Sequence, residues 1–156
     1  RASLRTAVAF VALTSVALAL SAVENGHLLT LRSLSQAYAA AGAADRELFE
    51  TLRVLFGSAR NWAHYTHLMV TGISILAFFV ALFRFFLVPR ALAAFGIAAA
   101  ILQITAVTMP IFGQPVVFLM LAPIGLAIVS LATWLLVKGL AASRLPDRRS
   151  PDGEEP

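Results

Sequence analysis

The chain has 156 residues, of which 60% are hydrophobic and only 13% are charged, whereas an ordinary soluble domain is about 45–50% apolar and about 25% charged. It contains no cysteine, which excludes disulfides, thiolate metal sites and thiol catalysis. The formal net charge is +4, but the basic residues lie at the ends of apolar runs, where they anchor to lipid headgroups. We therefore infer no nucleic-acid binding.

The first apolar run, residues 6–23, is long enough to cross the roughly 30 Å hydrocarbon core of a bilayer. Arg1 and Arg5 before it, with Ala19-Leu20-Ser21 as a weak cleavage site, also fit a secretory signal peptide. The run is long for that role, and we favour a true span. Because the chain begins at Arg1 without an initiator methionine, we expect a processed or truncated product, or a portion of a longer chain.

Polar and small residues separate this span from a predicted amphipathic helix at residues 45–56. The first helix is expected to continue beyond the membrane surface, with a bend at Gly26. In the amphipathic helix, apolar side chains recur at helical spacing and form a stripe on one face: Leu48, Leu52, Leu55 and Phe56. Asp45 is the predicted N-cap and Gly57 the predicted stop. This helix is expected outside the cytoplasm, where it either lies on the membrane or the bundle, or acts as a lid or partner-docking surface.

Three further spans are predicted from the remaining apolar runs, at residues 63–88, 91–109 and 116–137. Pro123 lies inside the last of them and removes one backbone donor, which predicts a kink and frees the carbonyl of Leu119. Residues 1–142 are therefore expected to form one four-helix transmembrane domain. The polar, proline-rich residues 143–156 cannot bury enough apolar surface to fold, so we expect a disordered cytoplasmic tail.

Lysine and arginine counts predict the orientation, because cytoplasmic loops carry an excess of these residues. With four spans, eight of them lie on the side of both termini: Arg1, Arg5, Arg84, Arg90, Lys138, Arg144, Arg148 and Arg149. Four lie on the other side: Arg32, Arg46, Arg53 and Arg60. Both termini are therefore expected in the cytoplasm, and the protein in a bacterial cytoplasmic (inner) membrane.

Two histidines, His64 and His67, lie three residues apart at the start of the second span and share one helix face. Glu24 and His27, also three apart, follow the first span, and the predicted topology brings both pairs to the same membrane face. Carboxylate and imidazole ligands on neighbouring helices are typical of metal sites in bundles, and two histidines on separate helices also suit a haem. The alternative is that the histidines, next to an aromatic belt, merely face headgroups and water.

Gln103 is the most polar side chain within the third span and needs a hydrogen-bond partner inside the bundle. The carbonyl freed at Leu119 by Pro123 is one such partner. The glutamine either holds helices together or belongs to a polar pathway for a solute. Gly96 and Ala100, a small-xxx-small pair, predict close helix packing. No catalytic triad, phosphate loop or carboxylate dyad occurs within the spans, so nothing argues for an enzyme.

Residues 60–140 together resemble a family of small bacterial multi-pass membrane proteins that is catalogued as a domain of unknown function. The resemblance rests on a histidine that opens a glycine-containing span, on LVPRALAAFGI across the Pro-Arg turn, and on APIGLAIVSLATWLLVKG. The Trp-Leu-Leu-Val-Lys-Gly ending of the family is matched by Trp134–Gly139. Family members generally have more spans, so this chain would match the later ones. The resemblance implies an inner-membrane helical bundle and supplies no activity, substrate or cofactor.

We therefore predict an all-α integral membrane protein, a bundle of four transmembrane helices with one short amphipathic helix. The leading function is a scaffold or accessory subunit without catalysis, which packs in the lipid bilayer against itself or a larger complex. The alternative is a membrane redox protein that binds a metal or haem through the outer-face cluster Glu24, His27, His64 and His67. Solute transport beside Gln103 and Pro123 ranks third.

Overall fold

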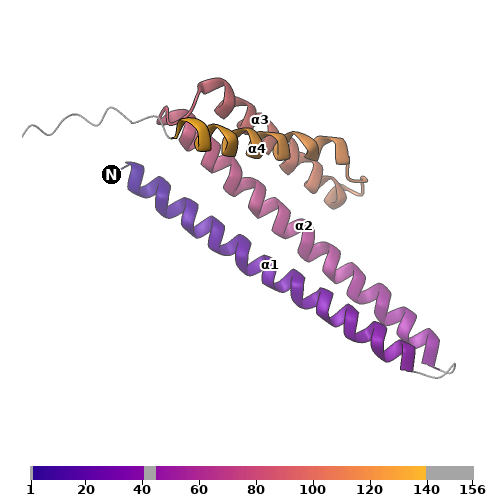
Figure 1. The fold of residues 1–156 in the computed structure, drawn as a ribbon. Helices are drawn as coiled ribbons and strands as arrows, with labels where there is room; N and C mark the ends of the chain where they lie inside the picture. The colour runs from indigo at the N-terminus through magenta and orange to yellow at the C-terminus, as the bar shows by residue number, and fades with distance from the viewer. Residues whose placement is uncertain (1, 41–44, 140–156) are drawn as a thin grey trace, which may run out of the picture.

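Helices make up almost all of residues 2–40 and 45–139, the part of the chain that the computed structural model describes. In chain order they are α1 (Ala2–Ala40), α2 (Arg46–Arg84), α3 (Arg90–Thr108), the short 3-10 helices η2 (Met109–Phe112) and η3 (Phe118–Leu121), and α4 (Ala122–Lys138) (Figure 1). Within these ranges, four helical segments are long and apolar enough to cross a membrane: Leu4–Ala40, Arg46–Arg84, Arg90–Phe112 and Phe118–Lys138. The predicted all-α membrane fold is confirmed, whereas the expected tail at 143–156 lies outside the described residues.

α1 and α2 are single, unbroken helices of 39 residues each. α1 continues past the first span as expected, and it passes through Gly26 without interruption. The predicted stop at Gly57 is wrong, because α2 runs through it from the amphipathic segment 45–56 into the second span. A glycine inside a helix costs only about 1 kcal/mol relative to alanine, and the packing of α1 along α2 offsets that cost. The amphipathic segment is therefore the first part of α2 and not a separate helix.

The predicted kink at Pro123 is also wrong. The chain leaves the turn after α3 through η3, and α4 starts only at Ala122, so Pro123 occupies the first turn of α4. Proline suits that position, because the N–H groups of the first turn have no acceptor inside the helix. Before η3 the chain reverses at Gly113, whose φ of 72° lies in the left-handed region that glycine adopts without strain.

The second span is shorter than predicted. α2 ends at Arg84, whereas the predicted span ends at residue 88.

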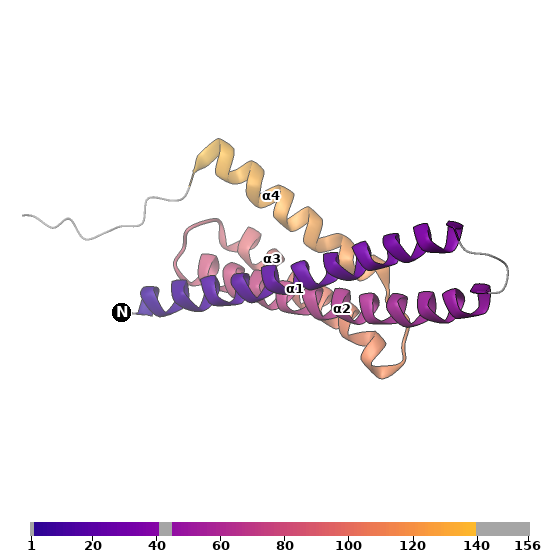
Figure 2. The ribbon, with the colours of Figure 1, turned by 90° about the horizontal axis from the view of Figure 1, so that it is seen from below.

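The helices pack in the order in which they follow one another in the chain. α1 lies antiparallel along α2, α2 packs against α3, and α3 packs against α4 (Figure 1 and Figure 2). Among the described elements α1 packs against no helix except α2, so the bundle is an open row. α1 and α4, the helices at the two ends of this row, therefore leave most of their apolar surface unburied, as helices in contact with lipid do.

The best-packed core lies where the end of α2 meets α3 and α4. Its buried members are Phe79, Leu82, Val88, Ala93, Ala99, Ala127 and Leu131. Gly96 of α3 lies so close to the Phe79 ring that an added Cβ would overlap the ring atoms, and Ala100 is fully buried one turn further along α3. The close packing predicted from Gly96 and Ala100 is confirmed, because small residues are what let two helix backbones approach this closely.

Gly96→Ala is expected to lower the free energy of unfolding by about 1–3 kcal/mol, because the new Cβ must displace the buried Phe79 ring and overpacking has that cost. Steric trapping of the protein in bicelles measures this quantity. Gly125→Ala in α4 is the matched control, since a Cβ there meets nothing within 4 Å, and it should cause no loss. Equal losses from the two substitutions would contradict the close contact between α2 and α3.

Candidate functional site

The end of α3 marks the level at which α1 and α2 extend past the rest of the bundle. α3 has 19 residues, and its length of about 28 Å matches the roughly 30 Å hydrocarbon core of a bilayer. Gly96 of α3 lies against Phe79 of α2. Further along α3, Ile104 lies against Gly72 of α2. These two contacts define an antiparallel register between α2 and α3. When the register is extended to the end of α3, its last turn lies about level with His67 of α2.

Beyond that level α1 and α2 continue side by side as a pair of helices, residues 25–40 and 46–60, which we call the distal hairpin. Figure 2 shows the pair extending well past the end of α3. At 1.5 Å per residue the distal hairpin extends by about 25 Å, so α1 and α2 are much longer than a bilayer core requires. We call the part of the bundle that is level with α3 the membrane-length bundle. Glu24, His64 and His67 lie at its junction with the distal hairpin.

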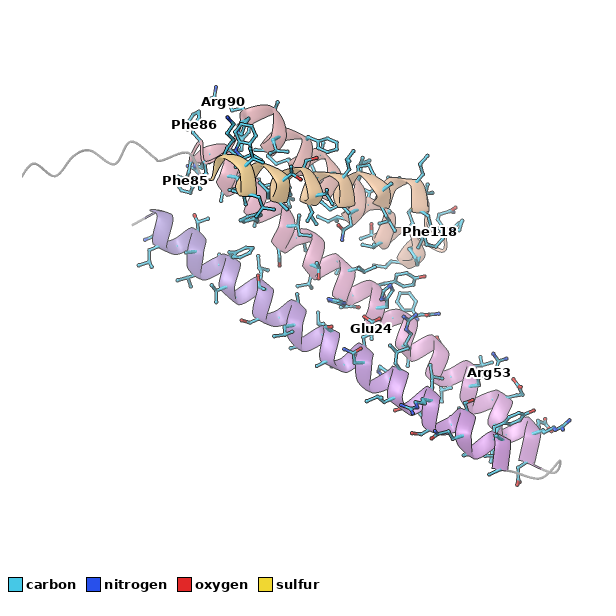
Figure 3. The ribbon with its side chains drawn as sticks, viewed as in Figure 1. Glu24, Arg53, Phe85, Phe86, Arg90 and Phe118 are labelled. Carbon is cyan, nitrogen blue, oxygen red and sulfur yellow. The ribbon has the colours of Figure 1, made fainter. Side chains whose placement is uncertain are left out.

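Glu24 of α1 is the centre of a charged cluster that joins α1 to α2 (Figure 3). Its Oε1 accepts a hydrogen bond from His64 Nδ1 at 2.8 Å, and its Oε2 accepts one from His67 Nδ1 at 3.2 Å. Arg60 Nη2 donates to Oε1 at 3.3 Å and forms an ion pair. Glu24 is only 9% exposed, and an unpaired carboxylate at such burial would be costly. The structure thus brings together three of the four residues predicted to share a site.

The hydrogen bonds of the cluster determine which nitrogen of each imidazole carries a proton. An ionised carboxylate can only accept, so both Nδ1 atoms are protonated donors. In the neutral imidazoles, Nε2 of His64 and Nε2 of His67 are then lone-pair acceptors without a hydrogen-bond partner among the described residues. A carboxylate behind an imidazole orients metal-ligating histidines in many proteins. Charge-assisted hydrogen bonds of the same kind also join two helices without any metal.

His27 does not join this cluster. It is half-buried on α1 and makes no hydrogen bond or ion pair with any residue in the described ranges. Across 2–40 and 45–139, no group of three or more His, Asp or Glu side chains is arranged to hold a metal ion. Within this arrangement Glu24 is the hydrogen-bond partner of the two imidazoles.

Arg60 belongs to the site, although the sequence analysis names it only as one of the charges that predict the orientation of the protein in the membrane. The signal is nevertheless present, because Arg60 lies four residues before His64 and seven before His67, on the same face of α2. Thr71 and Ser74 continue that spacing into the span. These five residues form a polar seam along α2, and its end at the distal hairpin holds the Glu24 carboxylate.

Gln103 of α3 bonds the backbone of α2 inside the membrane-length bundle. Its Nε2 donates to the carbonyl of Leu68 at 3.5 Å, so the predicted partner, the carbonyl of Leu119, is wrong. Leu119 lies exposed in η3, before the start of α4. Gln103 is 5% exposed, and its Oε1 and the Oγ1 of Thr71 are buried without a hydrogen-bond partner in the described part of the chain. Gln103 therefore links α3 to α2 through one of its two polar atoms.

A family model described as a domain of unknown function (DUF4386) matches residues 1–139, and the chain belongs to this family. No curated protein and no solved structure matches the chain. The match confirms the resemblance found in residues 60–140 and extends it over the first span and the distal hairpin. Glu24 and its histidine partners on α2 all lie within the family domain.

Glu24→Ala is expected to lower the free energy of unfolding by about 1–3 kcal/mol, because Arg60 and the two imidazoles lose their acceptor in a partly buried site. Glu50→Ala is the matched control. Glu50 pairs with Arg53 at 2.8 Å, but both side chains are more than half exposed, and such pairs contribute about 1 kcal/mol or less. Steric trapping in bicelles measures both losses, and a loss for Glu50→Ala as large as that for Glu24→Ala would show that the burial of Glu24 has no consequence.

Proposed function

We propose that this member of the DUF4386 family is a non-enzymatic scaffold or accessory subunit of a complex in a bacterial cytoplasmic membrane, and that its distal hairpin contacts the partner. The observation that carries the proposal is the length of the α1–α2 pair, which continues about 25 Å past the level of α3. Crossing the bilayer needs only about 20 residues. The additional length is useful to a protein that must reach something beyond the membrane surface.

The distal hairpin exposes apolar side chains beyond the membrane-length bundle. Leu48, Val54 and Leu55 are each more than half exposed. Leu52 and Phe56, which belong to the predicted apolar stripe, are partly buried, so the stripe divides between packing against α1 and an outward face. Exposed apolar side chains gathered on a surface outside the membrane support a protein contact there.

Contacts at both ends of the distal hairpin hold its two helices together. Near the tip, the rings of Tyr38 and Phe49 meet edge to face with centroids 5.8 Å apart. At the base, the Glu24 carboxylate binds three side chains of α2. A hairpin that is fastened at both ends presents its outward face at a fixed distance from the membrane, which suits a scaffold.

The charge distribution supports an orientation with both termini in the cytoplasm and the distal hairpin outside it. The start of α1, the turn between α2 and α3, and the end of α4 lie at one end of the molecule (Figure 1). The described basic residues at that end are Arg5, Arg84, Arg90 and Lys138. Together with those outside the described ranges they outnumber the basic residues of the hairpin by eight to four, and the side with more lysine and arginine is the cytoplasmic side.

A photo-cross-linking amino acid at Leu55 is expected to form discrete protein adducts in cells, because Leu55 is 62% exposed on the distal hairpin. Leu126 is the matched control, since it is 61% exposed but lies in α4 within the membrane-length bundle. Gel shifts and mass spectrometry of the adducts are the measurement, and they distinguish a second copy of this chain from another protein. No protein adduct at Leu55, or the same adducts at Leu126, would contradict the proposed role of the distal hairpin.

A second function, the binding of a metal ion or haem, is favoured by one feature of the Glu24 cluster. Both imidazoles bond Glu24 through Nδ1, which leaves the Nε2 atoms of His64 and His67 as potential ligands. A carboxylate behind such an imidazole fixes its orientation and raises its basicity. Imidazole suits zinc, copper and iron, and haem iron also takes histidine ligands. In this function Glu24 positions the ligands and is not itself a ligand.

If the second function holds, gently solubilised protein should carry stoichiometric metal or a Soret band. His64→Ala and His67→Ala should abolish that signal, and Glu24→Gln should weaken metal binding about 10- to 100-fold, as loss of an orienting carboxylate does. His27→Ala is the matched control and should change nothing, because His27 lies apart from the cluster. Metal analysis measures the bound metal, and a visible spectrum measures the Soret band. A colourless protein free of metal would contradict this function.

A further inference from the structure

A cavity of about 390 Å³ lies at the end of the molecule opposite the distal hairpin. It forms where the turn between α2 and α3 faces the last turn of α4, and the side chains of Phe86, Arg90, Trp134 and Lys138 line it. Figure 3 shows Phe86 and Arg90 together at this end of α2, far from Arg53 of the hairpin. Two cations and two aromatic rings therefore line one cavity at the edge of the membrane-length bundle.

Neither cation of the cavity is neutralised by a carboxylate in the described residues. The guanidinium of Arg90 lies over the Phe86 ring, with Cζ 4.3 Å from the ring centroid. This contact orients the guanidinium but supplies no negative charge. None of the ion pairs within 2–40 and 45–139 involves Arg90 or Lys138. The carboxylates of those ranges belong to the hairpin and its base: Glu24, Asp45, Glu47 and Glu50.

The N-terminus of α3 adds to the positive potential of the cavity. Pro89, which lines the cavity, is the N-cap, and no side chain caps the helix. The first backbone hydrogen bond of α3 runs from Ala93 N to the Pro89 carbonyl at 3.1 Å. The N–H groups of residues 90–92 therefore have no acceptor inside the helix, and such amides favour a bound anion.

A larger cavity of about 600 Å³ adjoins the first and lies between α3 and α4. The two cavities share Pro89, Trp134 and Lys138. From there the larger cavity follows apolar side chains such as Leu92 and Val129 along the two helices. A basic pocket at the membrane edge is thus continuous with an apolar groove inside the span, which matches the phosphate and the acyl chain of a phospholipid.

We propose that the two cavities form one binding site for an anionic phospholipid. Arg90, Lys138 and the first amides of α3 hold the headgroup phosphate, and an acyl chain lies in the groove between α3 and α4. Basic pockets between membrane helices are known to recognise anionic headgroups. A free phosphate ion would use the basic cavity alone, and the adjoining apolar groove favours the lipid. This lipid site is independent of the partner contact proposed above, because it lies at the opposite end of the molecule from the distal hairpin.

Trp134 provides the readout, because it lines both cavities. The other tryptophan of the chain, Trp62, lies near the distal hairpin, so Trp62→Phe leaves Trp134 as the sole tryptophan, which is excited selectively at wavelengths that tyrosine does not absorb. The full chain with this substitution is placed in nanodiscs of mixed phosphatidylglycerol and phosphatidylcholine, in which only one lipid at a time carries brominated acyl chains. Bromine quenches tryptophan on contact, so the ratio of the two quenching values gives the enrichment of anionic lipid beside Trp134.

Phosphatidylglycerol is expected to be enriched beside Trp134. Arg90→Gln and Lys138→Gln should each lower that enrichment about fivefold, the effect of one cation beside an anionic headgroup. Arg90→Lys keeps the charge and should retain most of the enrichment, which separates loss of charge from misfolding. Arg5→Gln with Arg84→Gln is the matched control at the same end of the molecule, because neither residue lines either cavity, and it should leave the enrichment unchanged.

Equal quenching by the two brominated lipids would overturn the proposal. An equal fall in the Arg5→Gln, Arg84→Gln control would overturn it too, by assigning the enrichment to general surface charge. Loss of the enrichment on joint substitution of Arg144, Arg148 and Arg149 by glutamine would assign it to the C-terminal residues. Displacement of the lipid by inorganic phosphate at constant ionic strength would assign the cavity to a free anion.

Discussion

The structure depends on the neutralisation of one carboxylate at the edge of an apolar span. Glu24 is 9% exposed, and a buried carboxylate is tolerated only with charged or hydrogen-bonded partners. All of its partners come from α2, so the cluster fixes how α1 lies along α2. Since α1 packs against no other described helix, the Glu24 cluster is the polar contact that specifies its position. In lipid, apolar contacts alone specify helix pairing weakly.

The two ends of the bundle differ in charge as well as in shape. At the junction with the distal hairpin, the Glu24 carboxylate is matched by the Arg60 guanidinium and by two imidazoles of the neighbouring helix. At the opposite end, Arg90 and Lys138 line a cavity and have no carboxylate partner among the described residues. Between the ends, α2 and α3 approach closely at Gly96 and hold the bundle together. The buried carboxylate of Glu24 is thus paired within the chain, whereas the exposed side chains of Arg90 and Lys138 are available to the anionic lipid that we propose.

Sequence alone predicts the class and the spans, because hydropathy and helix length are local properties. It also predicts the meeting of Glu24 with His64 and His67, since consecutive spans pack as neighbours. It fails at Gly57, where helix propensity predicts a break, because tertiary packing keeps α2 continuous. It fails at Pro123, where a kink is predicted, because α4 starts only at Ala122 and the proline lies in its first turn. It also fails where residues distant in sequence converge, as at the partner of Gln103 and at the cavity lined by Arg90 and Lys138, because such contacts depend on helix register.

We propose that α1 and α2 leave the bilayer just beyond Glu24 and project on the side away from the start of α1 and the end of α4. Because the chain has no cysteine, Ser58→Cys in the distal hairpin and Ser130→Cys inside α4 can each be labelled alone. Spheroplasts are treated with a membrane-impermeant maleimide before and after lysis in detergent. The Ser58→Cys protein is expected to react in intact spheroplasts, and the Ser130→Cys protein is not. Protection of the Ser58→Cys protein until the membrane is dissolved would contradict it.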